Sequence, residues 1–197
     1  MKISDRKMII IFLIVIILLS IILLYKINST PQYNEQLYSE VYAEYNEILD
    51  NIDESKDMNN FETKESNNKI GKVIALIRIS KINIIYPVIA NTTMENLKIA
   101  PTRLAGGEPN EVGNLCIIGH NMKNNEQFSN LHKLKVGDKV DILNIDGTKT
   151  VYTVYDIYTV NENDLSCTSQ NTDGKKEVTL ITCTKNKNKR LVVKCRE

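Results

Sequence analysis

The chain has 197 residues, 42% of them hydrophobic, and its 25 basic and 24 acidic residues leave a formal net charge of +1. This length accommodates one domain with a real core and leaves no room for a second catalytic domain. The balanced charge argues against nucleic-acid binding, which usually requires a basic patch on a domain of high isoelectric point.

The N-terminal part of the chain is predicted to anchor the protein in a membrane. Residues 8–25 contain no charged side chain, and about 18 such residues are near the lower limit for crossing a bilayer as a helix. Basic residues precede this run, and such residues favour the cytoplasmic side. A cleaved signal peptide is the alternative, but no small-x-small cleavage site follows. We therefore expect a cytoplasmic N-terminus at 1–7, an uncleaved transmembrane helix at 8–27, and the remainder outside the cell.

The next segment, residues 28–70, is expected to be a stalk. Within it, residues 32–51 carry apolar side chains at spacings of three and four, which predicts an amphipathic helix. We interpret this helix as packing on the domain or the membrane surface rather than as a ligand site. Residues 53–69 are polar and rich in Asn and charges, which is typical of a flexible linker. The folded domain is expected to begin near Gly71 and to span residues 71–197.

From residue 74 onward the pattern changes to short β-rich runs separated by turn residues. Gly-Gly, Gly-Asp and Asp-Gly pairs mark the turns. Brief helical pieces are expected at 93–98 and 128–131. Many short strands with few helices predict a closed or nearly closed all-β barrel. The expected strands are residues 74–79, 84–88, 115–120, 139–143, 150–160, 178–182 and 190–196.

Two apolar runs end in residues suited to covalent catalysis. Residues 178–183 read V-T-L-I-T-C and place Cys183 at a predicted strand end, seven residues before Arg190. Residues 114–120 read N-L-C-I-I-G-H and end in His120, one of only two histidines. Cysteine catalysis needs a nucleophile, a proton-transfer partner that the fold brings close, and a donor for the developing oxyanion. Cys183, His120 and Arg190 are candidates for these roles, although His120 as an ordinary strand-end histidine is the alternative.

Strand alternation predicts that Cys183 and Arg190 share one face. Alternate residues of the last strand, beginning at Leu191, form an apolar face, so Arg190 points the opposite way. If Val178 and Leu180 line the same interior as that apolar face, Cys183 also faces outward. The short connection between the two strands then puts the thiol and the guanidinium within reach.

The remaining cysteines are interpreted as structural. Cys116 and Cys195 lie in apolar strand runs, where cysteine usually behaves as a small buried hydrophobe. Cys167 lies in a polar loop and is expected to be an incidental exposed thiol. A nucleophilic Cys183 has to stay free, so we do not expect the four cysteines to form two disulfides.

A zinc site built on Cys116 and His120 is not favoured. Four residues of strand separate them by about 13 Å, too far for two ligands that each lie about 2 Å from one ion. The sequence also contains no C-x-x-C or H-E-x-x-H pattern. We expect neither a metal nor a cofactor, and we expect His132 to lie in a short surface helix without a chemical task.

These motifs resemble those of the sortases, membrane-anchored cysteine transpeptidases of Gram-positive bacteria. The signature of that family is a T-L-x-T-C strand with an upstream histidine and a downstream arginine, and residues 179–183 read T-L-I-T-C. The resemblance covers roughly residues 74–197, and T-L-I-T-C with the tight D-G turn is most like class D. Other matching motifs, in the family's order, are G-N-L-C-I-I-G-H-N, F-S-N-L, L-K-V-G-D-K-V and R-L-V-V-K.

The resemblance implies an eight-stranded sortase-type β-barrel that acts on exported proteins carrying an LPxTG-like C-terminal sorting signal. Cys183 would cleave the signal after its threonine through a thioester, His120 would transfer protons, and Arg190 would hold the oxyanion. The implied acceptor is an amine of a peptidoglycan precursor or of a pilin. The alternatives are a barrel that binds sorting signals without turnover, a membrane-tethered barrel used only for interaction, and a hydrolytic cysteine peptidase.

Overall fold

The computed structural model divides the chain into two compact units, Met1–Ser39 and Glu40–Glu197. In the first unit, residues 15–20 are helical and their side chains are exposed. Among the residues that the structure describes, no helix is long and apolar enough to cross a membrane. The predicted stalk helix and linker, and most of the predicted transmembrane helix, lie outside the described residues. Those described are 12, 15–20, 43, 71–122, 126–185 and 188–197.

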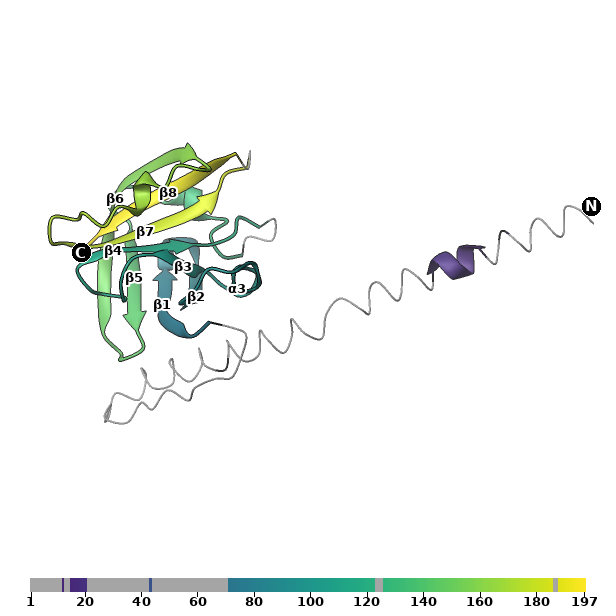
Figure 1. Cartoon of the computed structure of the whole chain (residues 1–197), viewed down its shortest axis with the longest axis horizontal. Coiled ribbons are helices and arrows are strands. Elements are labelled where there is room, and N and C mark those ends of the chain that lie inside the picture. The colour runs from purple at the N-terminus through teal and green to yellow at the C-terminus, as the bar shows by residue number, and fades with distance from the viewer. Residues whose placement is uncertain (1–11, 13–14, 21–42, 44–70, 123–125, 186–187) are drawn as a thin grey trace, which may run out of the picture. The chain divides into compact units, whose positions relative to one another are not determined.

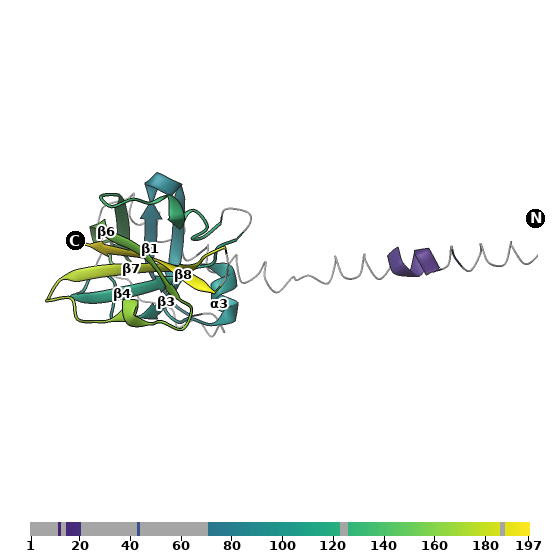
Figure 2. The same ribbon diagram turned by 90° about the horizontal axis from the view of Figure 1, so that it is seen from above.

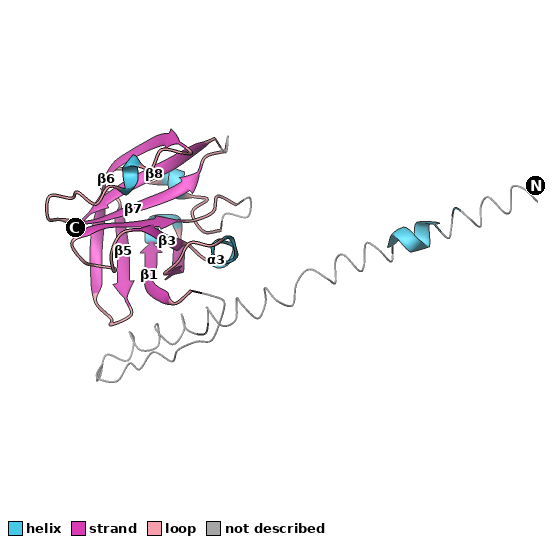
Figure 3. Cartoon of the chain, in the orientation of Figure 1, coloured by secondary structure: helices cyan, strands magenta, loops and turns pink. Residues whose placement is uncertain are grey.

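The second unit contains a closed barrel whose strands follow the order β1-β2-β3-β4-β7-β8-β6-β5 (Figure 1). The predicted all-β barrel and its eight strands are therefore confirmed. Short helices lie in the connections between strands (Figure 3), namely η1 (Ser80–Ile82), α3 (Met94–Ile99), η2 (Leu131–Lys133) and η3 (Ser166–Thr168). The strands are β1 (Val73–Ile79), β2 (Ile84–Ile89), β3 (Thr102–Ala105), β4 (Gly113–Ile118), β5 (Lys139–Asn144), β6 (Lys149–Asn161), β7 (Lys176–Cys183) and β8 (Lys189–Arg196).

The sequence pattern located seven of these strands and missed β3. This strand has only four residues, of which one is charged, so it shows no apolar alternation. Two further expectations are corrected. His120 lies two residues beyond the end of β4 rather than in the strand, and the helical turn expected at 128–131 begins at Leu131. His132 lies in η2 as expected, and its Nδ1 is 2.9 Å from the carbonyl oxygen of Ser129.

Alternate residues of the strands fill the barrel interior. Val178 and Leu180 of β7 share this core with Val193 and Cys195 of β8, as the strand alternation predicted. Full burial of an aliphatic side chain such as Leu180 stabilises the fold by about 1.5–3 kcal/mol relative to leaving it exposed. The opposite faces of β7 and β8 therefore point away from the core.

A second, smaller cluster lies on the outer face of the sheet. Cys116 of β4, Ile181 of β7 and Val192 of β8 pack together there, and Cys167 of η3 covers them. Cys167 is only 5% exposed, so the expectation of an exposed thiol was wrong. The polar residues around Cys167 concealed that η3 turns this one side chain onto an apolar sheet surface.

Candidate active site

Parallel pairing between β4 and β7 brings His120 to the end of β7 that carries Cys183. The two strands run side by side (Figure 2), with Ile118 opposite Ile181. The contact continues past the end of β4, because the N–H of Gly119 donates to the carbonyl of Ile181 at 3.0 Å. Extending this register by two residues sets His120 level with Cys183.

Two side-chain hydrogen bonds fasten the loop that carries His120 to β7. The hydroxyl of Thr182 donates to the carbonyl of Gly119 at 2.7 Å. The Nδ2 amide of Asn121 donates to the carbonyl of Cys183, also at 2.7 Å. The residues on both sides of His120 are therefore bonded to the two residues that end β7.

Antiparallel pairing between β7 and β8 places Arg190 directly opposite Cys183. Directly opposed residues project to the same side of a sheet, with Cβ atoms about 4.5–5.5 Å apart. The predicted placement of these two side chains on one face is confirmed. Since the core lies on the other face of β7 and β8, both side chains point outward.

The guanidinium of Arg190 contacts two acceptors. Its Nη2 lies 3.8 Å from the Oε2 carboxylate oxygen of Glu162, which immediately follows β6. Its Nη1 donates to the carbonyl of Lys189 at 3.5 Å. About a quarter of the Arg190 side chain is exposed, so the group remains accessible from solvent. A partly exposed guanidinium, whose planar fork offers several donors, is suited to hold a developing oxyanion.

His120 is half-buried, and this burial lowers the pKa of its imidazole below the ordinary value, because burial disfavours the charged form. At neutral pH the ring is therefore mainly neutral and able to accept a proton. Cys183 is also half-buried and is the last residue of β7. The pair thus combines a partly accessible thiol with a histidine in the basic form.

The other three cysteines differ from Cys183 in burial. All four thiols are free, and Cys116, Cys167 and Cys195 are buried. Burial raises the pKa of Cys116 to about 12, and it also raises the pKa of Cys167 and Cys195. Since the thiolate is the reactive form, these three thiols are protected from reaction at neutral pH.

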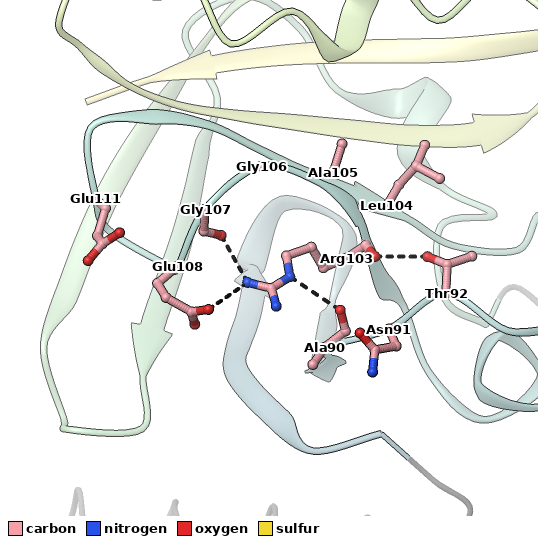
Figure 4. Close-up of a pocket in the computed structure, with 10 residues that line it drawn as sticks. All are labelled: Ala90, Asn91, Thr92, Arg103, Leu104, Ala105, Gly106, Gly107, Glu108 and Glu111. Atoms are coloured by element: carbon pink, nitrogen blue, oxygen red, sulfur yellow. Dashed lines mark hydrogen bonds and ion pairs between the residues drawn. The ribbon is translucent and has the colours of Figure 1, made fainter.

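A pocket of about 800 Å³ lies on a different part of the barrel, between the residues that follow β2 and the connection from β3 to β4 (Figure 4). Arg103 of β3 crosses it and donates to the carbonyls of Ala90 and Gly107 at 3.2 and 3.1 Å. It also pairs with Glu108 at 2.8 Å. None of the three candidate catalytic residues lines this pocket.

Sequence reasoning did not identify the residues that hold His120 in place. Asn121 stood within a quoted motif without an assigned task, and Gln127 follows a polar run that showed no sign of burial. Gln127 is nevertheless 2% exposed. Its role depends on contacts with β2 and α3, which no local pattern shows. Within the described residues, no group of three or more His, Cys, Asp or Glu side chains is arranged to hold a metal.

The family model described as a sortase domain matches residues 77–197. The chain belongs to the sortase family. A curated relative, "Sortase A" of Bacillus anthracis, is 31% identical over 125 residues, and the match covers 62% of this chain. The chain spans about 58% of the length of that relative.

Solved structures of other sortases share the fold. A Clostridium perfringens Sortase D5 transpeptidase is 30% identical with a TM-score of 0.65, covering 80% of this chain and 98% of that one. Sortase C1 of Streptococcus agalactiae is 29% identical with a TM-score of 0.58, covering 64% of this chain and 69% of that one. The resemblance predicted from the motifs is thus confirmed at the level of the family, and its relatives include a class D member.

Proposed function

We propose that this sortase is a cysteine transpeptidase acting on exported proteins that carry an LPxTG-like C-terminal sorting signal. The observation that carries the proposal is the direct pairing of Cys183 with Arg190 on the outer face of the barrel. The β4–β7 register adds His120 at the same edge. A nucleophile, an oxyanion donor and a proton-transfer group are thereby available to one bound peptide.

In the first step, His120 takes the proton of the Cys183 thiol, and the thiolate attacks the threonine carbonyl. A carbon–sulfur bond forms, and the guanidinium of Arg190 stabilises the negative charge on the carbonyl oxygen. The peptide carbon–nitrogen bond then breaks, and the protonated imidazole gives its proton to the leaving amine. The product is a thioester between Cys183 and the exported protein.

In the second step an acceptor amine attacks the thioester. His120 accepts a proton from that amine, a new amide bond forms, and the carbon–sulfur bond breaks to release Cys183. The acceptor that we propose is an amine of a peptidoglycan precursor or of a pilin. We also propose that residues 8–27 anchor the protein, with residues 1–7 in the cytoplasm and the barrel outside the cell.

Mass spectrometry on the full chain with an LPxTG-like peptide tests this function. The thioester is expected on Cys183 in the native chain, and Cys183→Ala is expected to abolish it while remaining folded, since Cys183 lies outside the core. Adding an amine should convert the thioester to a transfer product. Only hydrolysed peptide would instead indicate a peptidase, binding without any adduct would indicate a non-catalytic barrel, and an adduct on another cysteine would refute the assignment.

A further inference from the structure

Gln127 is a buried amide that joins the His120 loop to two other parts of the barrel. Its Oε1 accepts a hydrogen bond from the N–H of His120 at 2.8 Å. Its Nε2 donates to the carbonyl of Leu97 in α3 at 2.9 Å. Its own N–H donates to the hydroxyl of Tyr86 in β2 at 3.0 Å. One side chain and its backbone thereby connect His120 to α3 and β2.

The backbone of His120 is held on both of its polar groups by neighbouring residues of one segment. Gln127 takes its N–H, and the N–H of Phe128 donates to its carbonyl at 3.0 Å. A bridge between Asn121 and Gln127 closes the loop. Because both peptide groups that flank the Cα atom of His120 are fixed, the direction in which the imidazole leaves the chain is fixed as well.

The conformation of Gln127 shows that the surrounding contacts hold it firmly. Its φ is 45°, in the left-handed region that residues other than glycine seldom adopt. Such a conformation persists only where surrounding structure determines it, and it is frequent near functional sites. Here the hydroxyl of Tyr86 accepts a hydrogen bond from the N–H of Gln127, and Gln127 as a whole is only 2% exposed.

The two hydrogen bonds that the Gln127 side chain makes, to His120 and to Leu97, require an amide at this position. His120 offers a donor and Leu97 offers an acceptor, so the side chain between them has to accept at one end and donate at the other. A carboxylate would set a negative oxygen against the carbonyl of Leu97, and a thioether would leave both backbone groups without their partner. Buried polar groups left unpaired in this way are costly, so the loop would shift to restore them.

We propose that Gln127 is a positioning residue for the sortase reaction, which holds the imidazole of His120 at the distance from Cys183 that proton transfer requires. The inference rests on the proposed function. Gln127 acts through the backbone of His120 and need not touch the substrate. A displacement of about 1 Å at a reacting group can lower turnover by about 10²-fold. The hydrogen bonds of Gln127 that fix the backbone of His120 therefore bear directly on kcat.

The test compares Gln127→Met with Asn114→Leu in the full chain. Asn114 is the matched control, because it is also a buried amide that bonds backbone carbonyls, at 3.1 Å to Cys167 and 3.0 Å to Ser169. It lies near the start of β4, whereas His120 follows the end of that strand. With an LPxTG-like peptide, Gln127→Met should lower kcat by about 10- to 100-fold with KM within about twofold. Asn114→Leu should leave both within about twofold per folded molecule.

A second readout follows the imidazole itself by NMR titration of the ring signals. The chain has only two histidines, so His132→Gln identifies the signal of His120. In folded Gln127→Met the pKa of His120 should rise toward its ordinary value, because the released ring gains solvent. This readout needs no substrate, so it still tests the position of His120 if the native chain shows no turnover and the proposed function fails.

Tyr86→Phe provides a milder variant should Gln127→Met not fold. It removes only the hydroxyl that accepts the N–H of Gln127 and should lower kcat by several-fold with KM unchanged. The proposal is overturned if folded variants at Gln127 and Tyr86 keep native kcat and the native titration of His120. It is equally overturned if Asn114→Leu loses as much turnover as Gln127→Met, since the effect would then be general destabilisation.

Discussion

Cys183 and Arg190 are direct partners across β7 and β8, and the guanidinium of Arg190 also lies 3.8 Å from a carboxylate oxygen of Glu162. The arginine is thus placed by the sheet beside the thiol and oriented by an acidic residue at the end of the neighbouring strand β6. In the proposed reaction, a substrate carbonyl attacked by Cys183 would meet a cation that the sheet already places beside the thiol. Preorganised donors of this kind are usually the largest single source of transition-state stabilisation.

Replacing Arg190 with lysine should therefore reduce turnover by about 10²-fold or more, although the charge is retained. Lysine lacks the planar set of donors that can hold an oxyanion in fixed geometry. Steady-state kinetics provide the measurement, and Arg196→Lys is the control, because Arg196 lies on β8 but bonds Glu177 instead. Near-native turnover in Arg190→Lys would remove Arg190 from the proposed oxyanion contact.

Alkylation of the native chain by iodoacetamide at pH 8 should label Cys183 well before the other cysteines. With a pKa raised to about 12 by burial, Cys116 has only about 10⁻⁴ of its molecules as thiolate at this pH. Cys167 and Cys195 are buried as well. Peptide mapping after a short exposure gives the pattern, and unfolding in urea should make all four cysteines react. Equally rapid labelling of Cys167 would show that η3 does not protect it.

Substitution of Glu177 by glutamine should lower the free energy of unfolding by about 2–3 kcal/mol at pH 7. Burial by itself raises the pKa of Glu177, but hydrogen bonds from Arg196 and Tyr155 and the charge of Lys194 outweigh burial and hold the pKa below its ordinary value. Removing the carboxylate leaves Lys194, whose side chain is 12% exposed, without its partner at 3.3 Å. Glu162→Gln is the control, since that carboxylate is half exposed.

The pH dependence of this loss has a defined sign. A carboxylate whose pKa is lower in the folded than in the unfolded chain stabilises the fold fully above the unfolded value, about 4.3, and the contribution disappears as pH falls through the folded value. Urea unfolding of the native chain and of Glu177→Gln should therefore converge on acidification below about pH 4. A difference that stays constant to pH 3 would show that the ion pairs are not its source.

Gly119→Ala should impair the active site through Phe128. A methyl group at Gly119 would come within 2.8 Å of the Phe128 ring, which is fully buried and cannot give way. Overpacking of this kind costs about 1–3 kcal/mol, and we expect turnover to fall about 10-fold or more because His120 is the next residue. Thermal unfolding and kinetics measure the two effects. Gly107→Ala, where the nearest atom is 3.6 Å away, should change neither.

The sequence predicted most of this architecture because its strands alternate clearly. The face of Arg190 follows from the apolar alternation of β8, and the position of Cys183 from the end of an apolar run. The motif resemblance was needed to choose His120 over an ordinary histidine. Local pattern did not predict β3, whose four residues carry no alternation, or the burial of Cys167.

The contacts that place His120 could not be predicted from the sequence, because they join residues that lie far apart along the chain. Asn121 bonds to a residue 62 positions away, and Gln127 bonds to residues 30 and 41 positions away. Polar side chains in a polar segment have the composition of a solvent-exposed loop. Only the assembled barrel shows that the Gln127 amide is buried and bonded to backbone groups, and that the exposed Asn121 amide bonds the carbonyl of Cys183.

The position of β8 between β6 and β7 in the sheet order has a consequence for when this protein becomes reactive. β6 and β7 follow each other along the chain but do not pair, and β8 closes the barrel between them by pairing with both. Pairing with β8 is also what sets Arg190 opposite Cys183. A chain in which β8 is unpaired therefore has the thiol but lacks the guanidinium that we propose as its oxyanion donor, so closure of the barrel and completion of the proposed site depend on the same strand.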